Sequence, residues 1–214
     1  MTSHDEPSLT PGAPPLPWYS GPVMSVPAPR RRLTYQEYLG LERESEQRHE
    51  FWDGEIFAMA GGSPAHSALA ARVIAQLVTR LRGQPCQVFT SDLRVRVKAT
   101  GLTTYPDVTV VCGPLEHDDE DAYAIVNPVV LVEVSSEGTE AYDRNEKFAH
   151  YRRIPSLRAY VLVSQREPRL EVYRRNDDGS WTLDDARPPG AARLDAIGCT
   201  LDVAEIYAGV DLRR

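Results

Sequence analysis

Apolar residues recur at helical spacing after the Gly61-Gly62 pair. The stripe is wide and consists of Leu69, Val73, Leu77 and Leu81 beside Ala70, Ile74 and Val78. Ser63 and Pro64 are typical of an N-cap and a first helical position, and Gly83 is typical of a helix end. The pattern therefore predicts an amphipathic helix that begins at Pro64 and ends at Gly83.

Shorter patterns predict strands. Residues 93–97 alternate apolar with basic side chains, as a half-buried strand does. Residues 105–112 and 129–135 are richer in Val and Leu, which is typical of central strands. Residues 158–164 and 169–175 predict two more strands, and the Asp53-Gly54 pair predicts a hairpin within residues 49–59.

Capping residues predict the remaining helices. Thr34 and Glu37 form a capping box for a helix over residues 35–44, and Asp143 and Glu146 form one for a helix that Pro155 must stop. A short helix is predicted over residues 201–207. The order of elements predicts the α/β class, with a mixed β-sheet flanked by helices.

The N-terminal residues 1–29 are rich in Pro and poor in large apolar groups. Such a segment cannot repay the entropy of ordering, so we expect a flexible tail before one folded domain over residues 30–214. Met24 is an alternative start. No run of 18 apolar residues occurs and the first 17 residues lack the features of a secretory signal, so we expect neither a membrane span nor secretion.

The three cysteines, Cys86, Cys112 and Cys199, are widely scattered. Their spacing fits neither a disulfide framework nor a metal site, which favours a reducing, cytoplasmic location.

The formal net charge of −7 weakens any nucleic-acid hypothesis, because nonspecific affinity for nucleic acid depends on cationic surface. Part of the acidic excess is local, in residues 116–121. Basic residues gather elsewhere, in three groups: Arg30, Arg31 and Arg32; Arg94, Arg96 and Lys98; and Lys147, Arg152, Arg153 and Arg158. DNA binding therefore remains possible.

Two acidic residues lie where burial is costly. Asp107 occurs in Tyr-Pro-Asp-Val-Thr-Val-Val and Glu133 in Val-Val-Leu-Val-Glu-Val-Ser. A carboxylate in a central strand needs a compensating cation, either an Arg or Lys partner or a metal. If the two strands pair antiparallel, the carboxylates lie nearly level, and oxygen ligands of this kind suit Mg²⁺ or Mn²⁺.

Lys147 joins this pair by topology. Residues 129–135, the helix after Asp143 and residues 158–164 form a crossover unit, which places the helix start near the end of the strand that carries Glu133. Lys147 is predicted one turn into that helix, with His150 and Tyr151 on the same side. An ammonium there could polarise a water or stabilise charge on a phosphorane.

These residues resemble the Uma2 family over about residues 33–163. The resemblance is carried by Pro106-Asp107, Glu133-Val134-Ser135-Ser136, Asp143-Arg-Asn-Glu-Lys147-Phe148 with Tyr151, Ser91-Asp92-Leu93-Arg94-Val95, Arg48-His49-Glu50, Asp53-Gly54-Glu55, Met59-Ala60-Gly61-Gly62 and Pro64-Ala65-His66. It implies a restriction-endonuclease-like PD-(D/E)xK fold in which Asp107 and Glu133 ligate the metal and Glu50 adds a third carboxylate. Ser135 stands where the wider superfamily has lysine, and the resemblance implies that Lys147 replaces it.

Each of these residues also has a structural interpretation. Asp107 could cap a turn or pair with Arg94, Glu50 could be an exposed strand residue, and Lys147 a solvated one. His49 and His66 could be neighbours of the site. No histidine and cysteine spacing for zinc, no Gly-rich phosphate loop and no nucleophile elbow occurs.

Two classes of function remain. One is a Mg²⁺-dependent endonuclease acting on DNA; the other is a nuclease-fold module that binds nucleic acid or protein without turnover. A homodimer is possible in either case.

Overall fold

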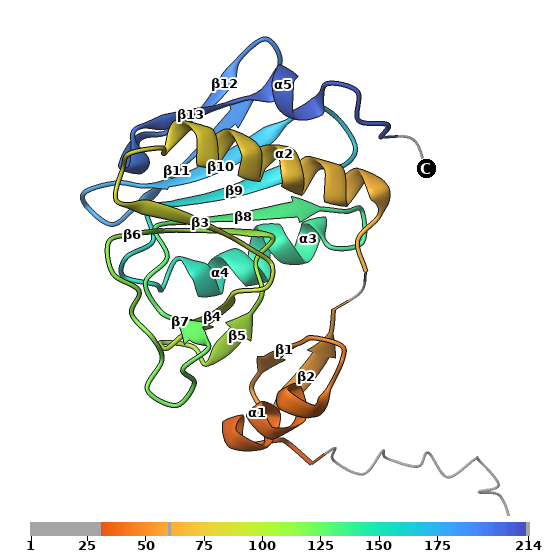
Figure 1. Cartoon of the computed structure of the whole chain (residues 1–214), viewed down its shortest axis with the longest axis vertical. Coiled ribbons are helices and arrows are strands. Elements are labelled where there is room, and N and C mark those ends of the chain that lie inside the picture. Colours follow the sequence, from red (N-terminus) through yellow and green to blue (C-terminus); the bar gives the residue numbers. More distant parts are fainter. Residues whose placement is uncertain (1–30, 60, 213–214) are drawn as a thin grey trace, which may run out of the picture. The chain divides into compact units, whose positions relative to one another are not determined.

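A six-stranded sheet holds most of the buried core (Figure 1). The computed structural model describes residues 31–59 and 61–212, so the predicted tail over residues 1–29 lies outside the described residues. The sheet has the order β11-β10-β9-β8-β6-β3. Its strands are β3 (Cys86–Thr90), β6 (Val108–Cys112), β8 (Val130–Ser135), β9 (Ala159–Ser164), β10 (Leu170–Arg175) and β11 (Trp181–Ala186). The pair β8–β9 is parallel and the other pairs are antiparallel, which confirms the predicted mixed sheet.

Helices cover both faces of this sheet (Figure 1). On one face lies α2 (Pro64–Arg80), which begins as predicted because the Ser63 side chain accepts a hydrogen bond from the His66 N–H. Its buried stripe of Leu69, Val73 and Leu77 packs on the Val side chains of β6, β8 and β9. The opposite face packs against the helical segment over residues 140–151.

That helical segment has three parts. They are α3 (Glu140–Tyr142), a π-helical turn (Asp143–Lys147) and α4 (Phe148–Tyr151). The prediction that Asp143 caps this helix is wrong. Ser136 and Thr139 exchange hydrogen bonds at the helix entry, so Asp143 lies one turn inside, where it is buried. Local π-helical turns are frequent at functional sites.

A second, five-stranded sheet has the order β2-β1-β5-β4-β7. Its strands are β1 (His49–Trp52), β2 (Glu55–Ala58), β4 (Arg94–Val97), β5 (Leu102–Thr104) and β7 (Ala124–Ile125). The β1–β2 hairpin is confirmed, and its turn needs Asp53 and Gly54 because both have positive φ, 49° and 81°. The predicted capping box of Thr34 and Glu37 starts α1 (Tyr35–Glu44).

The C-terminal part differs from prediction. Leu201 and Asp202, predicted to be helical, belong to β13 (Cys199–Asp202), which pairs with β12 (Ala191–Leu194). The helix α5 (Val203–Tyr207) starts only where the Asp202 carboxylate accepts the Glu205 N–H. In residues 31–59 and 61–212, no helix combines the length and the apolar character needed to cross a membrane.

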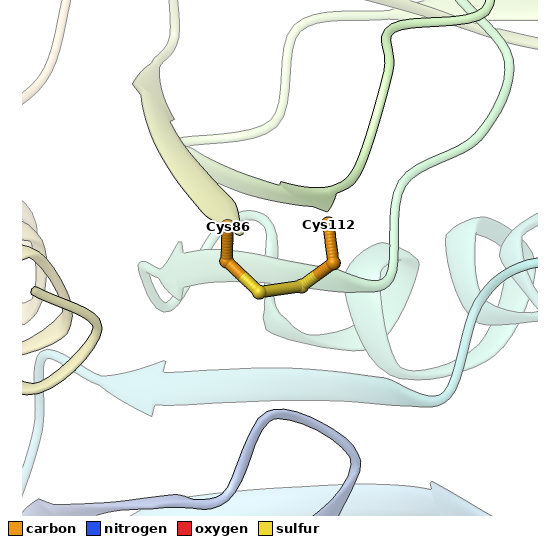
Figure 2. The surroundings of a disulfide bond; sticks show 2 residues. All are labelled: Cys86 and Cys112. Atoms are coloured by element: carbon orange, nitrogen blue, oxygen red, sulfur yellow. A yellow bond between two sulfur atoms is a disulfide. The ribbon is translucent and has the colours of Figure 1, made fainter. Parts of the chain in front are cut away.

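The cysteine prediction is also wrong. Cys86 and Cys112 form a disulfide (Figure 2). The two residues are 26 positions apart in sequence, but β3 and β6 pair antiparallel with Cys86 directly opposite Cys112. The strand that carries Cys86 was not predicted, and its pairing is what brings the two thiols together. The positions of the cysteines therefore do not support a reducing location. The third cysteine, Cys199, is buried and forms no disulfide.

Candidate active site

Asp107 and Glu133 lie side by side at one end of the β6–β8 pair. Val108 is opposite Val132 in this antiparallel pair, so the next position on each strand brings the two acids level, as the strand patterns predicted. The Val134 N–H donates a hydrogen bond of 2.7 Å to Asp107 Oδ2. The predicted alternative partner, Arg94, instead contacts Asp121 and Tyr105.

Glu133 is buried, with 5% of its surface exposed. Its Oε1 accepts a hydrogen bond of 2.8 Å from the Tyr151 hydroxyl. Burial raises the pKa of Glu133 to about 8, because the interior disfavours its charged form; nearby Lys147 opposes the shift and the surrounding carboxylates add to it. Glu133 is therefore a carboxyl group that holds a proton easily at neutral pH.

Lys147, which belongs to the helical segment, contacts two of the acids. Its Nζ lies 3.0 Å from Glu133 Oε1, 3.0 Å from Glu50 Oε1 and 4.0 Å from Asp143 Oδ1, and only 6% of the residue is exposed. Burial alone would lower the pKa of Lys147, but the three carboxylates raise it well above its ordinary value. The ammonium therefore stays charged.

Glu50 reaches the same place from the second sheet. It belongs to β1, where it is opposite Phe57 on β2, and its Oε1 also accepts a hydrogen bond from the Thr104 hydroxyl. The structure thus brings together all four predicted site residues, Glu50, Asp107, Glu133 and Lys147, which we call the acid–lysine cluster. Two sheets and one helix contribute to it.

Asp143 lies next to this cluster, although the sequence predicted for it only the role of a helix cap. Its Oδ2 accepts a hydrogen bond of 3.0 Å from the Ser135 hydroxyl. Burial raises the pKa of Asp143 as well, with Lys147 opposing the shift. Ser135, the residue at the position of the superfamily's lysine, thus orients a carboxylate that faces Lys147.

His66 contacts Asp107. Its Nε2 lies 3.1 Å from Asp107 Oδ2, and this hydrogen bond raises the pKa of His66 against the opposing effect of burial. A Cβ added at Gly62 would lie 2.7 Å from His66 Nδ1, so the ring packs directly on the Gly62 backbone. His49 instead contacts Glu42. His150, predicted on the side of Lys147, lies against the Trp52 ring, at 5.1 Å between centroids.

An open cavity of about 510 Å³ gives access to the cluster. Its lining includes all four cluster residues and His66, together with the larger side chains Phe57, Met59, Tyr105 and Tyr142. A second hollow of about 740 Å³ shares Ser63, Ser136 and Gln165 with it, but it contains none of the cluster residues. The acid–lysine cluster therefore faces the smaller cavity.

The donor atoms fit a hard divalent cation rather than zinc. Within residues 31–59 and 61–212, no three His, Cys, Asp or Glu side chains are grouped to hold a metal ion. Asp107 and Glu133 nevertheless present two level carboxylates, and Mg²⁺ characteristically uses one or two carboxylates with water and substrate phosphate. A cation there would also offset the cost of ionising Glu133. These two residues would hold the ion.

Comparison with known proteins shows the family of the chain. The sequence model of the Uma2 family, described as "putative restriction endonuclease", matches residues 35–204. The chain belongs to the Uma2 family. It is 38% identical over 186 residues to "Uncharacterized protein slr1290" of Synechocystis, with 87% of this chain and 97% of that protein covered. "Uncharacterized protein sll1609" of the same organism is 34% identical over 160 residues, with 75% and 90% covered.

A solved structure shows the same fold. The Uma2 chain resembles a "putative nuclease belonging to DUF820" from Anabaena variabilis with a TM-score of 0.68 and 16% identity; 82% of this chain and 98% of that one are covered. At this identity the likeness concerns the fold alone. The fold class is therefore confirmed as α/β and restriction-endonuclease-like.

Proposed function

We propose that this Uma2 protein is a metal-dependent endonuclease that hydrolyses DNA phosphodiester bonds. The observation that carries the proposal is the position of Lys147, whose Nζ lies 3.0 Å from carboxylates of both sheets at the base of an open cavity. Two level carboxylates can hold a divalent cation and a charged lysine beside them can stabilise charge on a phosphoryl group, and metal-assisted phosphodiester hydrolysis uses both functions. The family description as restriction endonuclease supports the same reaction.

Each side chain has a role in this proposal. Asp107 and Glu133 hold Mg²⁺ or Mn²⁺, which when bound supplies Lewis-acid polarisation of a phosphoryl oxygen and lowers the pKa of a water molecule. Lys147 presents a permanent positive charge to the phosphate, where charge develops in the transition state. Glu50 holds the lysine from the opposite side, and the Tyr151 hydroxyl fixes Glu133.

The second candidate is a nuclease-fold module that binds nucleic acid or protein without turnover. The same lysine favours it, because an ammonium buried between Glu50 and Glu133 already neutralises part of the acidic charge. Such an ion pair would keep the site stable without a metal, as a structural remnant.

A cleavage assay separates the two. Wild-type protein is incubated with supercoiled, linear and single-stranded DNA in Mg²⁺ or Mn²⁺, beside Asp107→Ala and an EDTA control. The nuclease proposal expects cleavage that needs both the metal and Asp107. Cleavage that persists equally in Asp107→Ala indicates a contaminant, and no cleavage under any of these conditions favours the binding module.

A further inference from the structure

Exposed arginines gather around the segment that joins α4 to β9. Arg152, Arg153 and Arg158 are exposed, and the Arg175 guanidinium donates hydrogen bonds of 3.1 Å to two backbone carbonyls of that segment. In the part of the chain that the structure describes, no carboxylate lies within ion-pair distance of any of these four side chains. We call them the arginine cluster.

Arginines elsewhere in the structure are mostly compensated. Those with carboxylate partners are Arg32, Arg48, Arg80, Arg94, Arg144, Arg166, Arg169, Arg174, Arg187 and Arg193. In a chain of formal net charge −7, a group of unpaired arginines makes a local positive region on an acidic protein. Such a region attracts anions and steers their approach.

A cavity of about 590 Å³ lies beside the arginine cluster and enlarges the basic surface. Arg153 lines it together with Arg96 and Lys98, and Glu116 is the acidic residue of this lining. Lys98 is partly offset by Asp119, at 2.7 Å. Arg96 is held by the Thr103 hydroxyl at 2.7 Å, and its guanidinium lies 3.7 Å from the Tyr35 ring centroid. The hollow is therefore concave and predominantly basic.

Arg158 of the arginine cluster and Glu133 of the acid–lysine cluster belong to the same face of the six-stranded sheet, on which the helical segment over residues 140–151 packs. Arg158 continues the β9–β10 ladder, since its carbonyl accepts the Arg175 N–H at 2.9 Å. Side chains alternate along a strand, so Arg158 is on the same face as Leu162, which pairs with Glu133 of β8. Four residues of strand place Arg158 about 13 Å from the level of Glu133.

We infer that the arginine cluster binds the phosphate backbone of a DNA strand that extends away from the acid–lysine cluster. Guanidinium groups suit this partner because they bind phosphate in a planar, two-pronged manner. The inference rests on the proposed nuclease function for the path of the strand, but the charge of the surface is independent of it.

The test measures binding without cleavage. The full chain is titrated into a short fluorescein-labelled DNA duplex in EDTA, and anisotropy gives Kd over a series of NaCl concentrations. Arg153→Ala with Arg158→Ala is compared with Arg43→Ala with Arg82→Ala, a matched pair of exposed arginines outside the cluster. The first pair is expected to raise Kd about tenfold and to reduce the salt slope by roughly 1.8, as for two lost phosphate contacts on duplex DNA, whereas the control pair leaves both unchanged.

Other outcomes overturn the inference. They are an equal rise in Kd for the two variant pairs, an unchanged Kd for the arginine-cluster pair, and no DNA binding by the wild type. Competition by polyglutamate equal to that by unlabelled DNA would indicate an acidic protein partner instead. Arg153→Lys with Arg158→Lys keeps the charge and is expected to retain most of the salt slope, which separates phosphate binding from misfolding. The binding assay is run in EDTA, which prevents metal-dependent cleavage, so its result does not depend on catalysis. A protein that binds DNA through these arginines but shows no cleavage in the Mg²⁺ or Mn²⁺ assay contradicts only the nuclease proposal.

Discussion

Lys147 Nζ lies 3.0 Å from Glu133 Oε1, and the same ammonium contacts Glu50 and approaches Asp143. One buried cation thus faces more carboxyl groups than it can neutralise. Asp107, level with Glu133, adds a further negative charge to the same cavity. The site therefore has an excess of acid that either protons or a divalent cation can balance, and this competition determines several measurable properties.

Mn²⁺ is expected to stabilise the protein through Asp107 and Glu133. A ligand that binds only the native state adds about 2.7 kcal/mol to the free energy of unfolding at a hundredfold excess over its Kd. Thermal melts with and without millimolar Mn²⁺ measure the shift, and Asp107→Ala should abolish it. Asp177→Ala, at an exposed turn, serves as the control that should keep it. A wild-type melting temperature indifferent to Mn²⁺ would count against the metal site.

Glu133 is expected to make stability fall as pH rises. Its pKa is raised from 4.5 to about 8 in the folded state, so the native protein holds a proton that the unfolded chain has released between these values. The stabilisation is complete below about pH 4.5 and is lost as pH rises through about pH 8, with a slope of up to about 1.4 kcal/mol per pH unit. Urea unfolding in EDTA over this range measures it. Glu133→Gln should flatten the slope; equal slopes in both proteins would contradict the shift.

The strands and acids of the site could be predicted because their signals are local. A carboxylate within an apolar run, as at Glu133, has a high cost wherever the strand is buried, and the antiparallel register of β6 and β8 then follows from their lengths. The hairpin and the helix after Ser63 were equally clear, since their turn and cap residues have specific backbone requirements. Lys147 was predicted near these acids from the crossover topology of β8, the helical segment and β9, and not from a local signal.

Other features depend on contacts between distant segments. The strand β3 is short and half exposed, so its sequence gave no clear pattern, and the Cys86–Cys112 disulfide that depends on it was missed. Asp143 matches a capping box, but the Ser136–Thr139 turn takes that role and turns Asp143 inward. The sequence indicated His66 only as a neighbour of the site; its contact with Asp107 depends on the packing of α2 on the sheet, because the two residues are remote in sequence.

Gly62 is expected to matter more than its neighbour Gly61 for metal binding. A Cβ at Gly62 would lie 2.7 Å from His66 Nδ1 and displace the ring that holds Asp107, whereas a Cβ at Gly61 meets nothing within 4 Å. Gly62→Ala should therefore raise the Mn²⁺ concentration needed for half of the thermal shift, by about tenfold as for loss of a partner that orients a ligand. Gly61→Ala is the matched control. Identical Mn²⁺ titrations for the two variants would show that His66 does not position Asp107.

The disulfide is expected to contribute substantially to stability. Cys86 and Cys112 are separated by 26 residues in sequence, for which the loss of chain entropy in the unfolded state predicts about 3.5 kcal/mol. Cys86→Ser with Cys112→Ser should lower the free energy of unfolding by about this amount, and dithiothreitol should bring the wild type to a similar value. Cys199→Ser, which leaves the bond intact, is the control. A wild-type protein insensitive to dithiothreitol, with a double variant of equal stability, would argue that the bond does not form.

Lys147→Ala is expected to separate binding from turnover. Asp107 and Glu133 remain, so Mn²⁺ should still raise the melting temperature, whereas DNA cleavage should fall by about 10²–10³, as when one transition-state donor is lost. Lys147→Arg should rescue poorly, because a planar guanidinium does not replace a compact ammonium held between Glu50 and Glu133. Arg82→Ala, at an exposed arginine outside both the cavity and the arginine cluster, controls for a general loss of positive charge. Single-turnover cleavage gives the rates, and melts in Mn²⁺ verify that each variant is folded and binds metal. Wild-type rates in Lys147→Ala would show that the buried lysine is structural, whereas a folded, Mn²⁺-binding variant that no longer cleaves is what a catalytic ammonium requires.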